Sequence, residues 1–173
     1  MNPPTHHQPR PAGRLPLYAL LALIPALFVA TIRGLCLIVT VEGASMEPAL
    51  SSGDRVLALR RWPARWLRRG QIVIVQPDQA LPASTYIKRV AGLPGDLLTT
   101  SLADVPPDHR TGLPWAHDEA GRRTWHIPPR SVFVRGDHQA HSIDSAIWGP
   151  IPASSLRGLV VMRLAQRPAE AQP

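Results

Sequence analysis

One uncharged apolar segment constrains the fold of this chain more than any other feature. Residues 15–32 read LPLYALLALIPALFVATI and contain no Asp, Glu, Lys, Arg or His. An α-helix of these eighteen residues would extend roughly 27 Å, against a bilayer hydrocarbon core of about 30 Å. The segment therefore predicts one transmembrane helix, in which Pro16 fits the first turn and Pro25 introduces a kink.

The residues before this segment indicate its orientation. Residues 1–14 are polar and proline-rich, and include Arg10 and Arg14 but no acidic residue. We expect a disordered tail, kept on the cytoplasmic side by its basic residues. A cleaved secretory signal is the competing interpretation, but its apolar region usually has about 7 to 15 residues and ends at a small-residue cleavage site. No convincing site of that kind precedes Ser45.

The rest of the chain is long enough for one compact domain. The 173 residues include 20 prolines and 12 glycines without an internal repeat, which favours short strands and turns over long helices. We predict a mainly β, extracytoplasmic domain at residues 33–166 and a C-terminal tail at 167–173. An excursion at about 101–129 would be a small lobe or a loop. The strand candidates are residues 35–43, 55–59, 71–76, 86–91, 131–135 and 156–163.

The metal-binding residue types do not form a recognisable motif. Cys36 is the only cysteine, so neither a disulfide framework nor a cysteine metal site is available. The spacing of His117, His126, His138 and His141 fits no zinc motif. We therefore predict that the protein needs neither a metal nor an organic cofactor.

The charge of the chain favours anionic partners. Eighteen arginines and one lysine against twelve acidic residues give a formal net charge of +7. Residues 60–69, RRWPARWLRR, interleave Trp62 and Trp66 with arginines, as is typical of a membrane interface. A solvated loop with inward-packed tryptophans and a single-stranded nucleic-acid site are the alternatives. We predict contact with anionic membrane lipid and no nucleic-acid partner.

Two segments carry residues suited to nucleophilic catalysis. Residues 43–54, GASMEPALSSGD, set Ser45 between small neighbours, which gives access to its hydroxyl, and the Ser45 backbone N–H can stabilise an oxyanion. On its own the segment is more typical of a turn. Residues 86–96, YIKRVAGLPGD, place Lys88 on the same face of a strand as Tyr86 and Val90.

Burial of Lys88 would make it a base. Desolvation disfavours the ammonium form and lowers the lysine pKa from about 10.4. A guanidinium cannot practically lose its proton, so a single lysine among eighteen arginines marks a position that needs a base. The alternative is a surface lysine with its charged end in water. A third segment, residues 135–149 (RGDHQAHSIDSAIWG), has hydroxyls and a carboxylate that could orient a neutral lysine, or could form an ordinary polar turn.

In this order, and after an apolar segment, the three segments resemble type I signal peptidases, the Ser/Lys enzymes that remove leader peptides from exported proteins. The resemblance covers nearly the whole chain. It implies that Ser45 is the nucleophile, that Lys88 is its general base and that Ser142 is a hydroxyl partner of the lysine. It also implies that Asp144 supports the site structurally.

The resemblance also has consequences for substrate binding. It implies that Met46, Tyr86 and Ile87 lie near shallow pockets that accept small side chains such as alanine. We expect the Ser45 backbone N–H to stabilise the oxyanion. The second donor is left open, because Gly43 stands where some members have a serine.

Two positions depart from the pattern of the family. This chain has His138 where members often have asparagine, and Ala146 where they often have arginine. If that arginine usually pairs with the aspartate two positions earlier, Asp144 must find another partner here, such as a nearby arginine.

The sequence thus predicts a membrane-bound serine endopeptidase that cleaves preprotein signal peptides after small residues, at Ala-X-Ala sites, through an acyl-enzyme. By resemblance, a lysine base fits bacterial or organellar members, and we predict a location in a bacterial cytoplasmic membrane. The alternatives are a specialised processing peptidase of a secretion or conjugation system and an inactive, anchored peptide-binding homologue. A self-cleaving repressor is disfavoured by the apolar segment.

Overall fold

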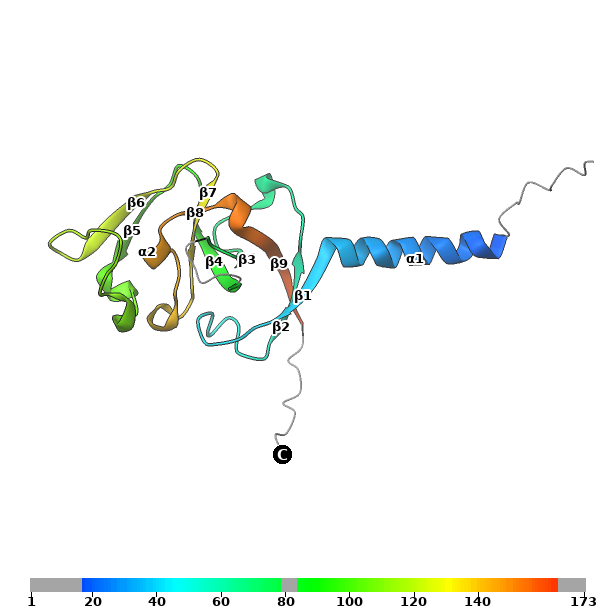
Figure 1. The fold of residues 1–173 in the computed structure, drawn as a ribbon, viewed down its shortest axis with the longest axis horizontal. Coiled ribbons are helices and arrows are strands. Elements are labelled where there is room, and N and C mark those ends of the chain that lie inside the picture. The colour runs from blue at the N-terminus through cyan, green and yellow to red at the C-terminus, as the bar shows by residue number, and fades with distance from the viewer. Residues whose placement is uncertain (1–16, 79–83, 165–173) are drawn as a thin grey trace, which may run out of the picture. The chain divides into compact units, whose positions relative to one another are not determined.

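The computed structural model describes residues 17–78 and 84–164 (Figure 1). The chain divides into two compact units, one ending at Arg33 and the other, a β-rich domain, beginning at Gly34. The tails expected at 1–14 and 167–173 lie outside the described residues.

The apolar segment forms the helix α1, Leu17–Leu35. Its apolar side chains are exposed to solvent, and Leu21, Ile24, Leu27 and Phe28 each keep more than three fifths of their accessible surface. Within residues 17–78 and 84–164 we find no helix that combines the length and the apolar character needed to cross a bilayer. The transmembrane helix predicted at residues 15–32 is therefore not confirmed.

The domain is built on a seven-stranded antiparallel sheet, so the prediction of a mainly β domain is confirmed. In spatial order its strands are β1 Cys36–Thr40, β2 Arg55–Leu59, β9 Leu156–Leu164, β3 Ile72–Val75, β4 Tyr86–Gly92, β7 Ser131–Arg135 and β8 Ile151–Pro152. The strands are rich in β-branched residues, which pack well on a pleated surface. Each expected strand segment overlaps one of these strands, and β4 and β9 each extend one residue further than expected.

A small lobe is inserted in the chain between β4 and β7, which are neighbours in the large sheet. It consists of a two-stranded sheet, β5 Leu97–Ser101 with β6 Arg122–His126, and of the 3-10 turns Leu102–Asp104 and Pro107–His109. The excursion expected at about 101–129 is therefore a lobe rather than a loop. In Figure 1 this lobe lies at the side of the domain away from β1 and β2.

The remaining helices are short. Between β7 and β8 the chain forms the 3-10 turn Gln139–His141 and the helix α2, Ser145–Trp148. Two further 3-10 turns are Ala64–Trp66 and Ala153–Ser155. The segment that carries the third motif is thus a pair of tight turns against the end of β7.

Strand β4 lies between two apolar clusters. The larger cluster includes Val75, Val90 and Trp148, and Tyr86 packs against it. The second cluster lies under the loop between β1 and β2, and Ile87 packs against it. Because side chains of a strand alternate in direction, β4 contributes to both clusters and is fixed between them.

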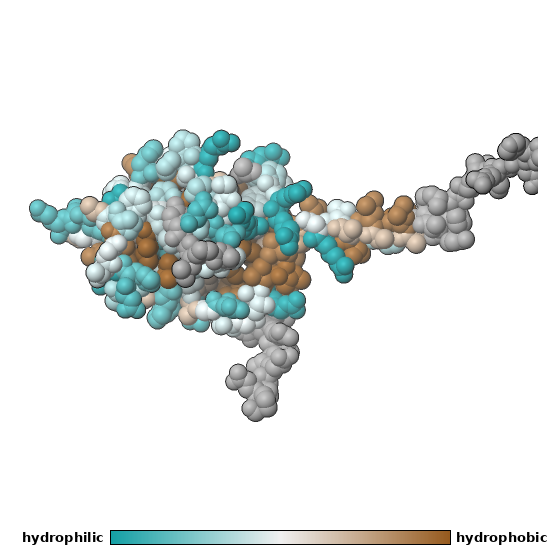
Figure 2. Space-filling view, in the orientation of Figure 1, coloured by the Kyte–Doolittle hydropathy of each residue, from teal (hydrophilic) through white to brown (hydrophobic). Residues whose placement is uncertain are grey.

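Most of the visible domain surface is hydrophilic, and an apolar area lies over the region of β1 and β9 (Figure 2). Strand pairing aligns Ile38 with Leu57 and Leu57 with Met162, across three neighbouring strands. Ile38 and Met162 are both more than half exposed. The three side chains form a short apolar row on this part of the sheet.

Candidate active site

Ser45 lies in the loop between β1 and β2, and buried side chains hold this loop in place. Met46 and Leu50 are at most 3% exposed and pack against Val41. The Leu50 N–H donates to the Met46 carbonyl (2.9 Å), and the Gly53 N–H donates to the Val41 carbonyl (2.9 Å). Ser45 itself is only half-buried, so its hydroxyl stays accessible.

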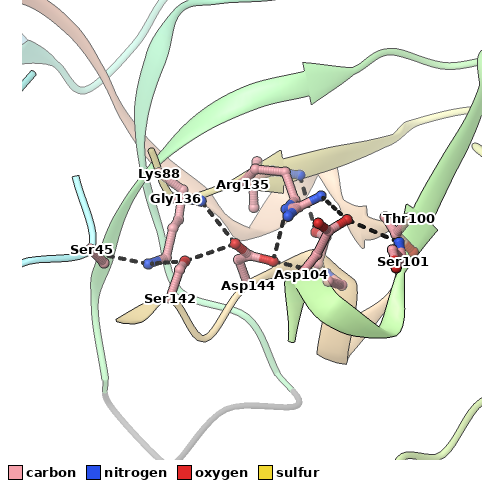
Figure 3. A network of polar contacts seen from close by, with 12 residues as sticks. Ser45, Lys88, Thr100, Ser101, Asp104, Arg135, Gly136, Ser142 and Asp144 are labelled. Carbon is pink, nitrogen blue, oxygen red and sulfur yellow. Dashed lines mark hydrogen bonds and ion pairs between the residues drawn. The ribbon is translucent and has the colours of Figure 1, made fainter. Parts of the chain in front are cut away.

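Lys88 is buried in β4 and contacts two hydroxyl groups. Its side chain is 1% exposed. The Nζ atom lies 2.9 Å from Ser45 Oγ and 3.0 Å from Ser142 Oγ (Figure 3). The Tyr86 ring covers one side of the amine, with its centroid 5.9 Å from Nζ. Two residues that lie 43 positions apart in the sequence are thus in direct contact.

Burial makes the neutral form of Lys88 more accessible. Burial lowers the pKa of Lys88 from 10.5 to about 8, because an ammonium loses solvation in the interior. The charges of Asp144 and Asp137 oppose this shift and raise the pKa. At a pKa of 8, roughly one lysine in ten is neutral at pH 7, against one in several thousand at the ordinary value. Lys88 is therefore able to accept a proton from Ser45.

Asp144 connects the lysine to the third motif. Its Oδ2 accepts hydrogen bonds from Ser142 Oγ (2.7 Å) and from the Gly136 N–H (2.8 Å), while Oδ1 accepts from the Ala146 N–H (2.9 Å). The last bond caps the N-terminus of α2. Ser142 and Asp144 are both 1% exposed. The structure brings Ser45, Lys88, Ser142 and Asp144 into one chain of contacts.

Gly136 allows the two halves of the site to approach each other. A Cβ atom at this position would lie 2.2 Å from Ser142 Oγ and 2.6 Å from the Ser45 carbonyl oxygen. The next turn adds a direct link, since the His138 N–H donates to the same Ser45 carbonyl (3.1 Å). Only a residue without a side chain fits between the serine loop and Ser142.

Two ion pairs near the lysine were not predicted from the sequence. Arg89 binds Asp137 through two hydrogen bonds, of 2.7 Å and 2.6 Å. Arg135 lies 3.4 Å from Asp144, and the sequence had suggested a nearby arginine as a partner of Asp144 without naming one. Arg89 and Arg135 are paired across β4 and β7, a register that cannot be read from the spacing of the residues in the sequence.

A groove of about 260 Å³ adjoins the first residues of β4, the strand that carries Lys88. It is lined by Val39, Thr40, Glu42, Thr85, Tyr86 and Ile87. Its two walls are therefore the end of β1 and the start of β4. A second pocket, of about 750 Å³, shares Val39 and Thr85 with this groove, and apolar Leu37, Ile74 and Leu156 line it together with three arginines.

Both walls of the groove offer main-chain groups. Val41 exchanges hydrogen bonds with Gly53 and Asp54, so alternation turns the polar groups of Thr40 away from β2. The Val90 carbonyl accepts from the Gly70 N–H, and the Val90 N–H donates to the Gln71 carbonyl. By the same alternation, the main-chain polar groups of Ile87 point away from β3. In the part of the chain that the structure describes, β7 pairs with β4 only from Arg89 onward.

The predicted pocket residues separate into two groups. Tyr86 and Ile87 line the groove, but Met46 does not, because its side chain is 1% exposed and belongs to the cluster under the serine loop. Among the histidines, His138 and His141 approach each other to 3.1 Å between ring nitrogens. The described residues contain no group of three or more side chains that could hold a metal ion.

Comparisons with known proteins match this geometry to one family. A family model described as "Signal peptidase, peptidase S26" matches residues 15–165. The chain is 31% identical over 134 residues to "Probable signal peptidase I-2" of Synechocystis sp., an alignment that covers 71% of this chain and 60% of that protein. It is 29% identical over 168 residues to "Signal peptidase I" of Leptolyngbya laminosa, with 85% and 74% covered.

A second group of relatives carries a different name. The chain is 33% identical over 129 residues to "Mitochondrial inner membrane protease subunit 1" of Homo sapiens, with 73% of this chain and 68% of that protein covered. The chain thus spans between about three fifths and three quarters of the length of these relatives.

Proposed function

Because this chain belongs to the S26 signal peptidase family, we propose that it is a serine endopeptidase that removes leader peptides from exported proteins. One observation carries the proposal. Lys88, with a pKa lowered to about 8, lies 2.9 Å from the hydroxyl of an accessible serine.

The reaction proceeds in two halves. The Ser45 oxygen attacks the carbonyl carbon of the scissile bond while Lys88 takes the hydroxyl proton, and the Ser45 backbone N–H stabilises the oxyanion. Lys88 then gives its proton to the leaving amine, so the C–N bond breaks and the leader stays as an ester on Ser45. Water attacks this ester while Lys88 accepts its proton. Lys88 then passes that proton to the departing Ser45 oxygen, which releases the leader with a free carboxylate and restores the serine and the neutral lysine.

Ser142 orients the lysine for both steps. Its hydroxyl donates to Asp144 (2.7 Å), so it can only accept from the Lys88 amine (3.0 Å). A neutral amine that donates to Ser142 has its lone pair free to accept from Ser45. Asp144 therefore fixes the direction of the hydrogen bonds as well as the position of Ser142.

The groove supports an extended peptide substrate. The polar main-chain groups of Thr40 and Ile87 can pair with a strand that enters between β1 and β4. Small side chains such as alanine suit a groove of about 260 Å³ with Tyr86 and Ile87 in its wall. The larger apolar pocket beside it suits the apolar part of a leader.

The place of action that fits these features is a membrane surface. The exposed apolar side chains of α1 need an apolar environment. We assign the chain to a bacterial cytoplasmic membrane, with its N-terminus in the cytoplasm and the β domain outside. Of the two tryptophans in 60–69, Trp62 packs against the core and Trp66 is 48% exposed, which leaves Trp66 and the arginines for anionic lipid.

The proposal is tested by cleavage of a preprotein that carries an Ala-X-Ala site, with detergent-solubilised protein. We expect Ser45→Ala and Lys88→Ala to abolish cleavage, and Ser154→Ala, at an exposed turn, to leave it unchanged. For the unaltered chain, kcat/KM should fall by about tenfold per pH unit below roughly pH 8, because the protonated lysine cannot act as a base.

Two outcomes would count against the proposal. Substantial turnover by either alanine variant would remove the Ser/Lys mechanism. Failure of the folded, unaltered chain to cleave would favour a specialised substrate, or a protein that binds leader peptides without cutting them.

A further inference from the structure

Arg135 occupies a position between two carboxylates at the inner end of the site. It is the last residue of β7, and its side chain is only 12% exposed. Its Nε atom lies 3.4 Å from Asp144 Oδ1, and its Nη1 atom lies 3.6 Å from Asp104 Oδ2 (Figure 3). At these distances the guanidinium acts through its charge rather than through short hydrogen bonds.

The small lobe supplies the second carboxylate in a fixed position. Asp104 ends the 3-10 turn after β5, and its Oδ2 accepts a hydrogen bond from the Ser101 N–H (2.9 Å). Ser101 Oγ in turn accepts from the Ala103 N–H, so the two bonds form a capping box at the N-terminus of the turn. Arg135 is therefore held from the lobe side while it faces Asp144.

The charge on Asp144 opposes the role of Lys88 as a base. One hydroxyl, that of Ser142, separates the carboxylate from the amine, with bonds of 2.7 Å and 3.0 Å. A carboxylate within about 6 Å stabilises an ammonium and disfavours the neutral amine. The other charged group that acts on Lys88 is Asp137, while the Ser45 hydroxyl and the Tyr86 ring are its uncharged neighbours.

Each of these two carboxylates has one arginine beside it. Asp137 is bound by Arg89 through two hydrogen bonds. The helix that Asp144 caps offers no cation, since its residues are Ser, Ala, Ile and Trp. In the part of the chain that the structure describes, the salt bridge of Asp144 is with Arg135.

We propose that Arg135 is a positioning residue that holds Asp144 and offsets its charge, and thereby increases the fraction of Lys88 in the neutral form that a general base requires. This proposal rests on the proposed function only where it concerns catalysis, in which Lys88 takes the proton of Ser45. The effect on the protonation of Lys88 exists with or without a substrate, and can be measured separately.

The sequence provides a direct readout, because Lys88 is the only lysine in the chain. Protein labelled with ¹⁵N-lysine gives one side-chain signal, whose titration follows Lys88 alone. In Arg135→Gln we expect the titration midpoint to rise by about one pH unit, because the carboxylate loses its offsetting charge. The acidic limb of kcat/KM should move by the same amount, with about a tenfold loss of activity at pH 7.

Two variants serve as controls for charge. Arg69→Gln breaks the exposed ion pair with Asp96, away from the site, and should leave the Lys88 midpoint unchanged. Arg135→Lys keeps a positive charge between the two carboxylates. It should keep the Lys88 midpoint near that of the unaltered chain, while its own second signal titrates at a higher pH.

The outcome separates a charge effect from a packing effect. If folded Arg135→Gln loses activity at every pH while the Lys88 midpoint stays in place, Arg135 is only structural and the proposal is wrong. If Arg135→Gln does not fold, Arg135→Lys decides, because an altered Lys88 midpoint in that variant would also overturn the proposal. An unaltered chain that cleaves no preprotein would refute the peptidase function but leave this titration as a valid test.

Discussion

Gly136 lies where the site leaves no space for a side chain. A Cβ atom there would overlap Ser142 Oγ at 2.2 Å and the Ser45 carbonyl oxygen at 2.6 Å. The hydroxyl can rotate, but the serine carbonyl belongs to a loop fixed by buried side chains, so the loop itself must shift. Overpacking of this kind typically costs about 1 to 3 kcal/mol.

We therefore predict that Gly136→Ala lowers kcat by about a hundredfold, because Ser45 and Lys88 lose their alignment. Gly34→Ala is the matched control, since nothing lies within 4 Å of a Cβ atom at Gly34. Steady-state kinetics and urea unfolding of both variants measure the effect. Nearly full activity of Gly136→Ala would mean that the loop is more compliant than its packing indicates.

The residues of the site were predictable only where a local pattern marks them. Ser45 and Lys88 stand out because small neighbours surround the serine and because the lysine is unique among arginines. Arg135 was not named, because its contact with Asp144 depends on how β7 ends against the turn before α2. Met46 was expected near a pocket but is buried, because the serine loop folds over it.

At the scale of elements, α1 is the one with the most exposed apolar surface. Leu23, Leu27 and Phe28 are each at least 60% exposed. Transfer of such a side chain from water to an apolar phase gains roughly 1.5 to 3 kcal/mol. We predict that the full chain floats with lipid vesicles and that the triple replacement of these residues by Gln reduces the bound fraction by more than tenfold.

Vesicles with and without anionic lipid distinguish the two sources of this binding. Apolar insertion of α1 predicts binding to both, and the arginines of 60–69 predict tighter binding to the anionic vesicles at low salt. The double variant Arg65→Gln/Arg68→Gln should lose the tighter binding to anionic vesicles and keep the binding to uncharged vesicles. Unchanged flotation of the triple α1 variant would contradict a lipid role for the helix.

Six of the seven strands of the large sheet were predictable, whereas the short β8 and the two strands of the lobe were not. Residues 55–59 and 131–135 are short apolar runs between turn residues, and both coincide with strands. β6 reads RRTWH and buries only Trp125, so its pattern is that of a surface segment. It becomes a strand by pairing with β5 across a twenty-residue excursion, which no local pattern records.

At the scale of the whole molecule, the buried lysine lowers stability at neutral pH. Lys88 is protonated up to about pH 8 in the folded state, but up to 10.5 in the unfolded chain. Between these values the unfolded state binds more protons, so the free energy of unfolding rises with pH. The total rise is up to roughly 3 kcal/mol, at about 1.4 kcal/mol per pH unit.

We predict that Lys88→Met lacks this rise and is more stable than the unaltered chain at pH 7. Methionine has a similar shape and carries no charge to desolvate. Urea unfolding at pH 7, 8, 9 and 10 measures both proteins, and contributions common to the two proteins cancel in the difference. Parallel curves for the two proteins would show that folding does not perturb the titration of Lys88.

The groove between β1 and β4 has a consequence for turnover. If a leader pairs with the main-chain groups of Thr40 and Ile87, as proposed, hydrolysis at Ser45 does not itself remove these bonds. The mature protein can depart at once, but the spent leader stays as a competitor of the next precursor. Under the proposed function this predicts product inhibition, in which the removal of used leaders limits the rate of further cleavage.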